Sequence, residues 1–326
     1  MESKELKNTN EIFGKVCFGG LVNLSKSAIN LRKKQILEGF RIHSCYHYGK
    51  ALDVIKQASE EVKIIPKLTT KVYFNLNILN RHDSILNQLN KITEKLNYVP
   101  KDWHIQLCAN PSINDLMNND FEIFKEKIFK NFGKLKIFIE TYPLWEKNTL
   151  EIIQTDKVIG SAFHLNSLII GVENDLFYKK PFYCIGLLGG GKHYKDRLLS
   201  LYKNLKMDDI EILLNKIKLS SLLDFNISYF LNNLNNPNFL YGVTAVNSEE
   251  NYDDLKKKIL FLKKLDNDQM KVFLDFKKNN YNKMLKLDPY GVKDFKFIDK
   301  IRFNRRRFIH DILTFLPFIK YKKKFF

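Results

Sequence analysis

The sequence predicts an α/β protein built as a (β/α)8 TIM barrel with a basic C-terminal helical extension. Short strand patterns alternate with helical patterns eight times along the chain, which favours a closed parallel barrel over a doubly wound open sheet. The chain has 326 residues, enough for a barrel of about 250 residues and a tail. We therefore expect the barrel at residues 1–265 and the extension at residues 266–326.

The first half of the chain contains five strand–helix units. Gly39 and Gly133 stand where the first and fourth helices are expected to end, the usual place for a helix-stopping glycine. We expect strands at 15–19, 40–45, 67–74, 103–108 and 135–140, and helices at 25–38, from 50 onward, and at 82–96, 120–131 and 148–154.

The second half continues the alternation. We expect strands at 158–163, 182–187 and 239–243, and helical segments at 174–179, 196–234 and 249–265. Beyond residue 265 the pattern changes to one more amphipathic helix at 266–279, followed by a turn signal at Pro289-Tyr290-Gly291.

The charge distribution argues against a nucleic-acid partner. The net charge is +18, but residues 276–326 hold 15 Lys and Arg against four Asp and Glu, which leaves only +7 on the rest. Within this tail, Arg305, Arg306 and Arg307 precede an apolar stretch. It either rests on an anionic membrane surface or packs its apolar side chains on the barrel.

The remaining composition suggests a cytoplasmic protein without a metal. No apolar run approaches the roughly 20 residues of a membrane span, and the N-terminus lacks a signal-peptide core. The cysteines at 17, 45, 108 and 184 are widely spaced, as expected for reduced thiols. No paired spacing of histidines predicts a metal site.

Two short motifs carry the chemistry. The run GFRIHSCYHYG (39–49) places Tyr48 just after the second strand, and TTKV (69–72) places Lys71 near the end of the third. The carboxyl ends of barrel strands meet at one mouth, where barrel active sites lie. Because a nearby ammonium lowers a phenol's pKa of about 10, Tyr48 and Lys71 form a credible general acid.

These motifs resemble the aldo/keto reductase superfamily over most of the chain, from about residue 15 to residue 255. Further similar segments are FGG at 18–20, IQLC at 105–108, GKLK at 133–136, LNSL at 165–168, LLGGG at 187–191, NPNF at 236–239 and SEE at 248–250. The resemblance implies an NAD(P)(H)-dependent oxidoreductase acting on a small carbonyl compound or alcohol. It implies Tyr48 as proton donor and Lys71 as its partner. The implied cofactor contacts are Asn166, Leu188, Gly189, Gly190, Gly191 and Ser248.

The chain departs from the family's four catalytic residues at two positions. The family's aspartate, which pairs with the lysine, falls on His43, and its strand-four histidine falls on Cys108. Without a carboxylate partner, we expect Lys71 to lose its proton more easily and to hold a phenolate less well. The family's 2′-phosphate-binding cations are absent from 244–252, so a preference for NADP is unsupported.

Two functions therefore remain open. Tyr48, Lys71 and the glycine loop favour an active oxidoreductase with an incomplete catalytic set. The changes at His43 and Cys108 favour a catalytically inactive barrel that serves as a binding or scaffold protein, with the basic tail as its contact surface.

Overall fold

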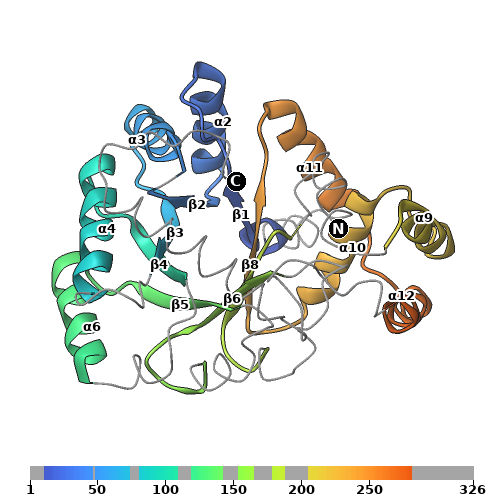
Figure 1. Cartoon of the computed structure of the whole chain (residues 1–326). Helices are drawn as coiled ribbons and strands as arrows, with labels where there is room; N and C mark the ends of the chain where they lie inside the picture. The colour runs from blue at the N-terminus through green and yellow to red at the C-terminus, as the bar shows by residue number, and fades with distance from the viewer. Residues whose placement is uncertain are drawn as a thin grey trace.

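The computed structural model describes residues 11–46, 48–73, 81–108, 119–141, 153–164, 178–187 and 205–280. Eight parallel strands pair in chain order, and β1 pairs with β8 to close the barrel. The labelled helices lie outside the strands, with α2, α3, α4 and α6 on one side of the barrel and α9, α10, α11 and α12 on the other (Figure 1). The predicted (β/α)8 barrel is therefore confirmed.

The strands lie within a few residues of their predicted positions. They are β1 (Val16–Gly19), β2 (Arg41–Cys45), β3 (Lys67–Tyr73), β4 (Lys101–Cys108), β5 (Lys136–Thr141), β6 (Gly160–His164), β7 (Phe182–Ile185) and β8 (Phe239–Ala245). Because all eight strands run parallel, their carboxyl ends gather at one mouth.

Four of the described helices, α2, α10, α11 and α12, begin at a side chain that caps the free backbone N–H groups. Ser25, Ser221, Ser248 and Asp266 each accept a hydrogen bond from the first turn that follows. The described helices are α2 (Lys26–Leu37), α3 (Ala51–Val62), α4 (Arg81–Leu96), α6 (Asn119–Phe132), α9 (Met207–Lys216), α10 (Leu222–Asn233), α11 (Glu249–Phe261) and α12 (Asn267–Asn279).

Some predictions concern residues outside the described part of the chain. These are most of the helices expected at 148–154 and 174–179, part of the segment at 196–234, and the tail from 281 to 326. The helix predicted at 266–279 is α12. The division into a barrel and an extension stays a prediction.

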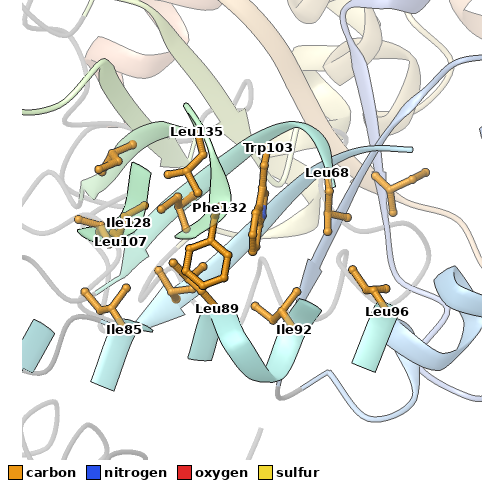
Figure 2. Close-up of a cluster of buried hydrophobic side chains, with 14 of the residues drawn as sticks. Leu68, Ile85, Leu89, Ile92, Leu96, Trp103, Leu107, Ile128, Phe132 and Leu135 are labelled. Carbon is orange, nitrogen blue, oxygen red and sulfur yellow. The ribbon is translucent and has the colours of Figure 1, made fainter. Parts of the chain in front are cut away.

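The main apolar core lies between the barrel wall and its helices. Along β3 and β4, alternate residues such as Leu68, Trp103 and Leu107 point outward and pack against Leu89 of α4 and Phe132 of α6 (Figure 2). This alternation follows from the two-residue repeat of a strand. It leaves the intervening residues of the same strands to fill the barrel interior.

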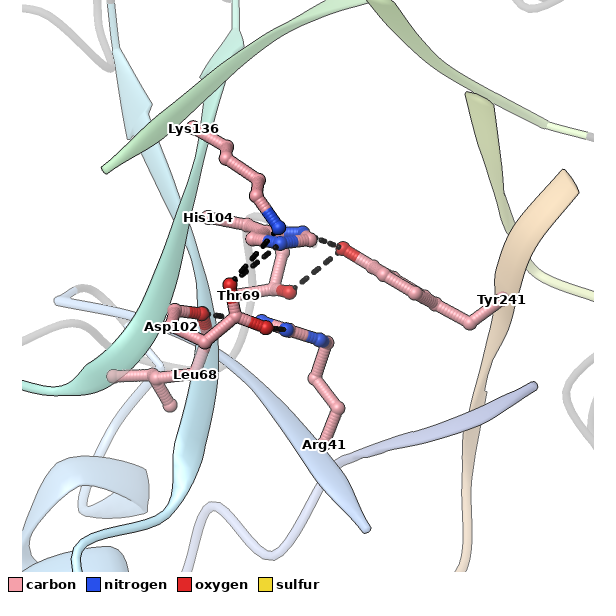
Figure 3. A network of polar contacts seen from close by, with 7 residues as sticks. All are labelled: Arg41, Leu68, Thr69, Asp102, His104, Lys136 and Tyr241. Carbon is pink, nitrogen blue, oxygen red and sulfur yellow. Dashed lines mark hydrogen bonds and ion pairs between the residues drawn. The ribbon is translucent and has the colours of Figure 1, made fainter. Parts of the chain in front are cut away.

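The floor of the barrel, at the amino ends of the strands, holds a polar network (Figure 3). Asp102 forms ion pairs with Arg41 and with Lys136, the latter at 3.1 Å. Above them, the Tyr241 hydroxyl lies 2.9 Å from the Thr69 hydroxyl and 2.8 Å from Nδ1 of His104. This network closes the barrel at the end opposite the mouth.

Candidate functional site

The mouth of the barrel gathers polar side chains from the carboxyl halves of β2, β3, β4 and β5. The strands are in register, with Cys45 beside Lys71 and Lys71 beside Gln106. Because inward and outward residues alternate, His43, Lys71, Gln106 and Glu140 all point into the barrel interior. The predicted placement of Lys71 at the mouth agrees with this arrangement.

Lys71 forms an ion pair with a carboxylate that the sequence analysis did not assign. Its Nζ donates to Oε1 of Glu140 at 3.1 Å, and the two side chains are only 14% and 1% exposed. An adjacent carboxylate favours the protonated form of a lysine. The expectation that Lys71 lacks a negatively charged partner is therefore wrong. The carboxylate comes from the end of β5 instead of from β2.

His43 is buried on β2 and stays neutral near pH 7. Burial, and next the positive charge of Lys71, lower the pKa of its imidazole to about 4. Among the described residues, its Nε2 atom has no hydrogen-bond partner. The ring of Tyr48 lies 6.1 Å from the His43 ring, centroid to centroid. Tyr48, on the loop after β2, thus lies beside this imidazole, and the charge of Lys71, on β3, acts on it.

Two further polar side chains, Tyr183 and Gln106, form a hydrogen bond inside the barrel. The Tyr183 hydroxyl of β7 donates to Oε1 of Gln106 at 2.8 Å, and both side chains are buried. The Gln106 amide in turn interacts with His43. The Tyr183–Gln106 hydrogen bond thus crosses the barrel interior from β7 to β4.

Of the remaining predicted site residues, Ser248 lies within the described part of the chain, and Cys108 does so with its backbone alone. Cys108 ends β4, but its side chain lies outside the described part. Ser248 is the N-cap of α11, and its hydroxyl accepts from the backbone N of Asn251 at 3.2 Å. Asn166, Leu188, Gly189, Gly190 and Gly191 also lie outside the described residues, so their cofactor contacts stay predictions.

The described residues show neither a metal site nor a membrane span. No group of three His, Cys, Asp or Glu side chains among them is arranged to hold a metal ion. No helix in the described part is long and apolar enough to cross a membrane. A hollow of about 370 Å³ lies between α9 and α12, but helices alone line it, so it is separate from the barrel mouth.

Solved structures with the same architecture are aldo-keto reductases. An aldose reductase from Giardia lamblia matches with a TM-score of 0.59 and 12% identity, covering 86% of this chain and 96% of its own. An aldo-keto reductase from Klebsiella pneumoniae in complex with NADPH matches with a TM-score of 0.57 and 12% identity, covering 81% and 90%. The chain has the aldo-keto reductase fold.

A third structure with this fold is an aldo-keto reductase from Bacillus halodurans in its holo form. It matches with a TM-score of 0.56 and 14% identity, covering 80% of this chain and 91% of its own. No family model matches the sequence, and no curated protein matches it. At these identities the likeness establishes the aldo-keto reductase fold, and the chemistry has to be argued from the residues at the mouth.

Glu140 is the main functional candidate that the sequence analysis missed. Its strand places Lys136, Phe138 and Glu140 on the inward face. A carboxylate on the inward face near the carboxyl end of a barrel strand is a signal that could have been read from the sequence. The comparison with the family's aspartate directed attention to β2 instead.

Proposed function

We propose that this chain is an NAD(P)(H)-dependent oxidoreductase that interconverts a small carbonyl compound and its alcohol. The observation that supports it best is the buried Lys71–Glu140 ion pair at the barrel mouth, at 3.1 Å. Tyr48 adjoins His43 at the same mouth, and the charge of Lys71 acts on that imidazole. A phenol near a charged lysine is suited to donate a proton to a developing alkoxide.

The chain's own residues would act on the oxygen of the substrate. Tyr48 donates its hydroxyl proton to the carbonyl oxygen while the carbonyl carbon accepts a hydride, and the phenolate regains a proton from solvent. The charge of Lys71 stabilises the phenolate during this exchange. A reduced nicotinamide cofactor, when bound, supplies the hydride and is itself oxidised.

The described residues fit a dinucleotide that lacks a 2′-phosphate. Helix α11 follows β8 at the mouth. Its first turn carries Glu249 and Glu250, and the fully described segment 244–252 contains no Lys or Arg. Carboxylates accept hydrogen bonds from ribose hydroxyls and repel a phosphate, which favours NAD(H) over NADP(H).

Cofactor titration tests the proposal directly. The purified protein is titrated with NADH and, separately, with NADPH while protein and nicotinamide fluorescence are followed. We expect saturable binding, tighter for NADH. The absence of binding at millimolar concentrations of both cofactors would reject the oxidoreductase.

A catalytically inactive binding protein is the second candidate. His43 is a neutral side chain at the position where the family has its aspartate, which favours a barrel that binds a partner without catalysing a reaction. In that case the tail, with its net charge of +11 over residues 276–326, is the proposed contact surface. Co-sedimentation with phosphatidylserine vesicles, compared with neutral vesicles, tests a membrane contact. Equal sedimentation with both would exclude an electrostatic one.

A further inference from the structure

We propose that Glu140 is the positioning residue that keeps Lys71 protonated at the barrel mouth. The two groups come from β5 and β3, which are separated by β4, and their side chains meet inside the barrel at 3.1 Å. The consequence for catalysis rests on the proposed function. The pairing itself makes a prediction about the charge of Lys71 that holds with or without turnover.

The surroundings of Lys71 explain why a carboxylate is needed. Burial disfavours the charged form of a lysine, and an opposite charge within about 4–6 Å restores it. The ammonium is largely withdrawn from solvent, with 14% of the side chain exposed. Of the described side chains from the packed elements, Gln106 of β4, which lies beside Lys71 in register, is uncharged.

His43 cannot take the place of the carboxylate. A histidine is either neutral or positive, and burial, followed by the nearby charge of Lys71, lowers the pKa of this one and keeps it neutral. The buried carboxylate of Glu140, 1% exposed, is in turn compensated by the ammonium. The pair therefore supplies both charges that a dry site needs in order to hold a protonated lysine.

The charge of Lys71 can be measured without any cofactor or substrate. Competitive labelling of amines with acetic anhydride over a pH series, read by peptide mass spectrometry, gives the titration of each reactive lysine, since only the neutral amine reacts. We expect Glu140→Gln to lower the pKa of Lys71 by about 1–3 units. Glu140→Asp keeps the charge and should show a smaller shift. An unchanged Lys71 titration in Glu140→Gln would overturn the proposal.

An exposed ion pair provides the matched control. Lys33 and Glu61 lie 2.6 Å apart, with side chains 31% and 50% exposed. Exposed pairs are weak because water screens them. We therefore expect Glu61→Gln to leave the titration of Lys71 unchanged. A shift of the Lys71 titration in Glu61→Gln as large as that in Glu140→Gln would remove the special role assigned to Glu140.

A second-site rescue separates charge from structure. His43 is close enough to Lys71 for the lysine's charge to affect its titration. The double variant His43→Asp with Glu140→Gln returns a carboxylate to the mouth from β2, the strand that pairs with β3 on the side away from β4. We expect it to recover at least half of the Lys71 shift, and no recovery would contradict the proposal. If Glu140→Gln does not fold, judged by circular dichroism, the double variant and Glu140→Asp decide the question.

The outcomes distinguish this proposal from the proposed function. A shifted Lys71 titration in a protein that binds no dinucleotide keeps the charge pairing and rejects the oxidoreductase. If the protein shows turnover but the Lys71 titration is unchanged in Glu140→Gln, the oxidoreductase is kept and the charge pairing is rejected. Where turnover is found, Glu140→Gln should move the alkaline limb of kcat/KM to lower pH, because the active form needs a protonated Lys71.

Discussion

The ring of Tyr48 faces the imidazole of His43 at 6.1 Å between centroids, with the two planes tilted by 47°. His43 belongs to β2, and Tyr48 lies three residues after the strand ends. The loop that carries the phenol is thus held against the barrel interior, beside the imidazole that adjoins Lys71.

Replacing Tyr48 with Phe should abolish proton donation while keeping the ring in place. General acid catalysis contributes about 10²–10⁴-fold, so we expect kcat to fall by that factor for any carbonyl substrate found. Cofactor affinity, measured by fluorescence, should change less than about twofold. Tyr98→Phe is the control, because it also removes a tyrosine hydroxyl. That hydroxyl lies 2.9 Å from the Ser59 hydroxyl of the outer helix α3 and not at the mouth. Unchanged turnover in Tyr48→Phe would reject Tyr48 as the acid.

The stability of the fold should fall in acid because His43 is buried without a charge. The unfolded chain binds a proton at this histidine below about pH 6.5, whereas the folded chain binds it only below about pH 4. Between these values the unfolded state holds more protons, so lowering the pH destabilises the fold by up to about 1.4 kcal/mol per unit. Urea unfolding at pH 6.5, 5.5 and 4.5 should show a smaller acid loss in His43→Gln than in wild type. Parallel curves for the two proteins would contradict this assignment.

Asp102→Asn should destabilise the floor network. Burial raises the pKa of the Asp102 carboxyl, but Arg41, Lys136 and His104 together hold it below its usual range. The change leaves Arg41, 9% exposed, without its carboxylate partner. We expect a loss of about 1–3 kcal/mol in the free energy of urea unfolding, with cofactor affinity unchanged. Asp253→Asn, which removes the half-exposed partner of Lys34, should cost less than about 0.5 kcal/mol. Equal losses of unfolding free energy in both variants would show that the floor network contributes no more stability than an exposed ion pair.

Gly160→Ala should disrupt the pairing of β6 with β7. A Cβ atom at Gly160 would stand 1.7 Å from the carbonyl oxygen of Pro181, which accepts from the backbone N of Ser161 at 3.1 Å. The backbone must therefore move, and we expect a loss of about 3 kcal/mol or more in thermal or urea unfolding. Gly14→Ala, where nothing lies within 4 Å, is the control. A Gly160→Ala protein as stable as this control would show that the strands tolerate the shift.

The barrel could be predicted from the sequence because each strand–helix unit has its own short-range sequence signals. Gly39 and Gly133 follow the ends of α2 and α6, and both adopt a positive φ of about the value expected for a helix stop. The alternation in β3 and β4 set Leu68 and Trp103 outward and Lys71 inward. Such short-range patterns need no knowledge of which strands become neighbours.

The partner of Lys71 could not be predicted in this way. Lys71 and Glu140 are 69 residues apart and meet only because the barrel closes with β4 between their strands. The analogy with a known family pointed to the residue that occupies the β2 position, which is His43. A strand-level reading would have shown that Glu140 faces inward, but the distance between the two side chains depends on the three-dimensional stagger of the strands.

One strand connects the two ends of the barrel. β5 places Lys136 in the floor network and Glu140 at the mouth, four residues apart on the same face. A single-residue insertion or deletion between them would turn one of the two toward the helices, since successive side chains alternate. The spacing of this strand is thus constrained from both sides, and engineering of the site should leave its length untouched.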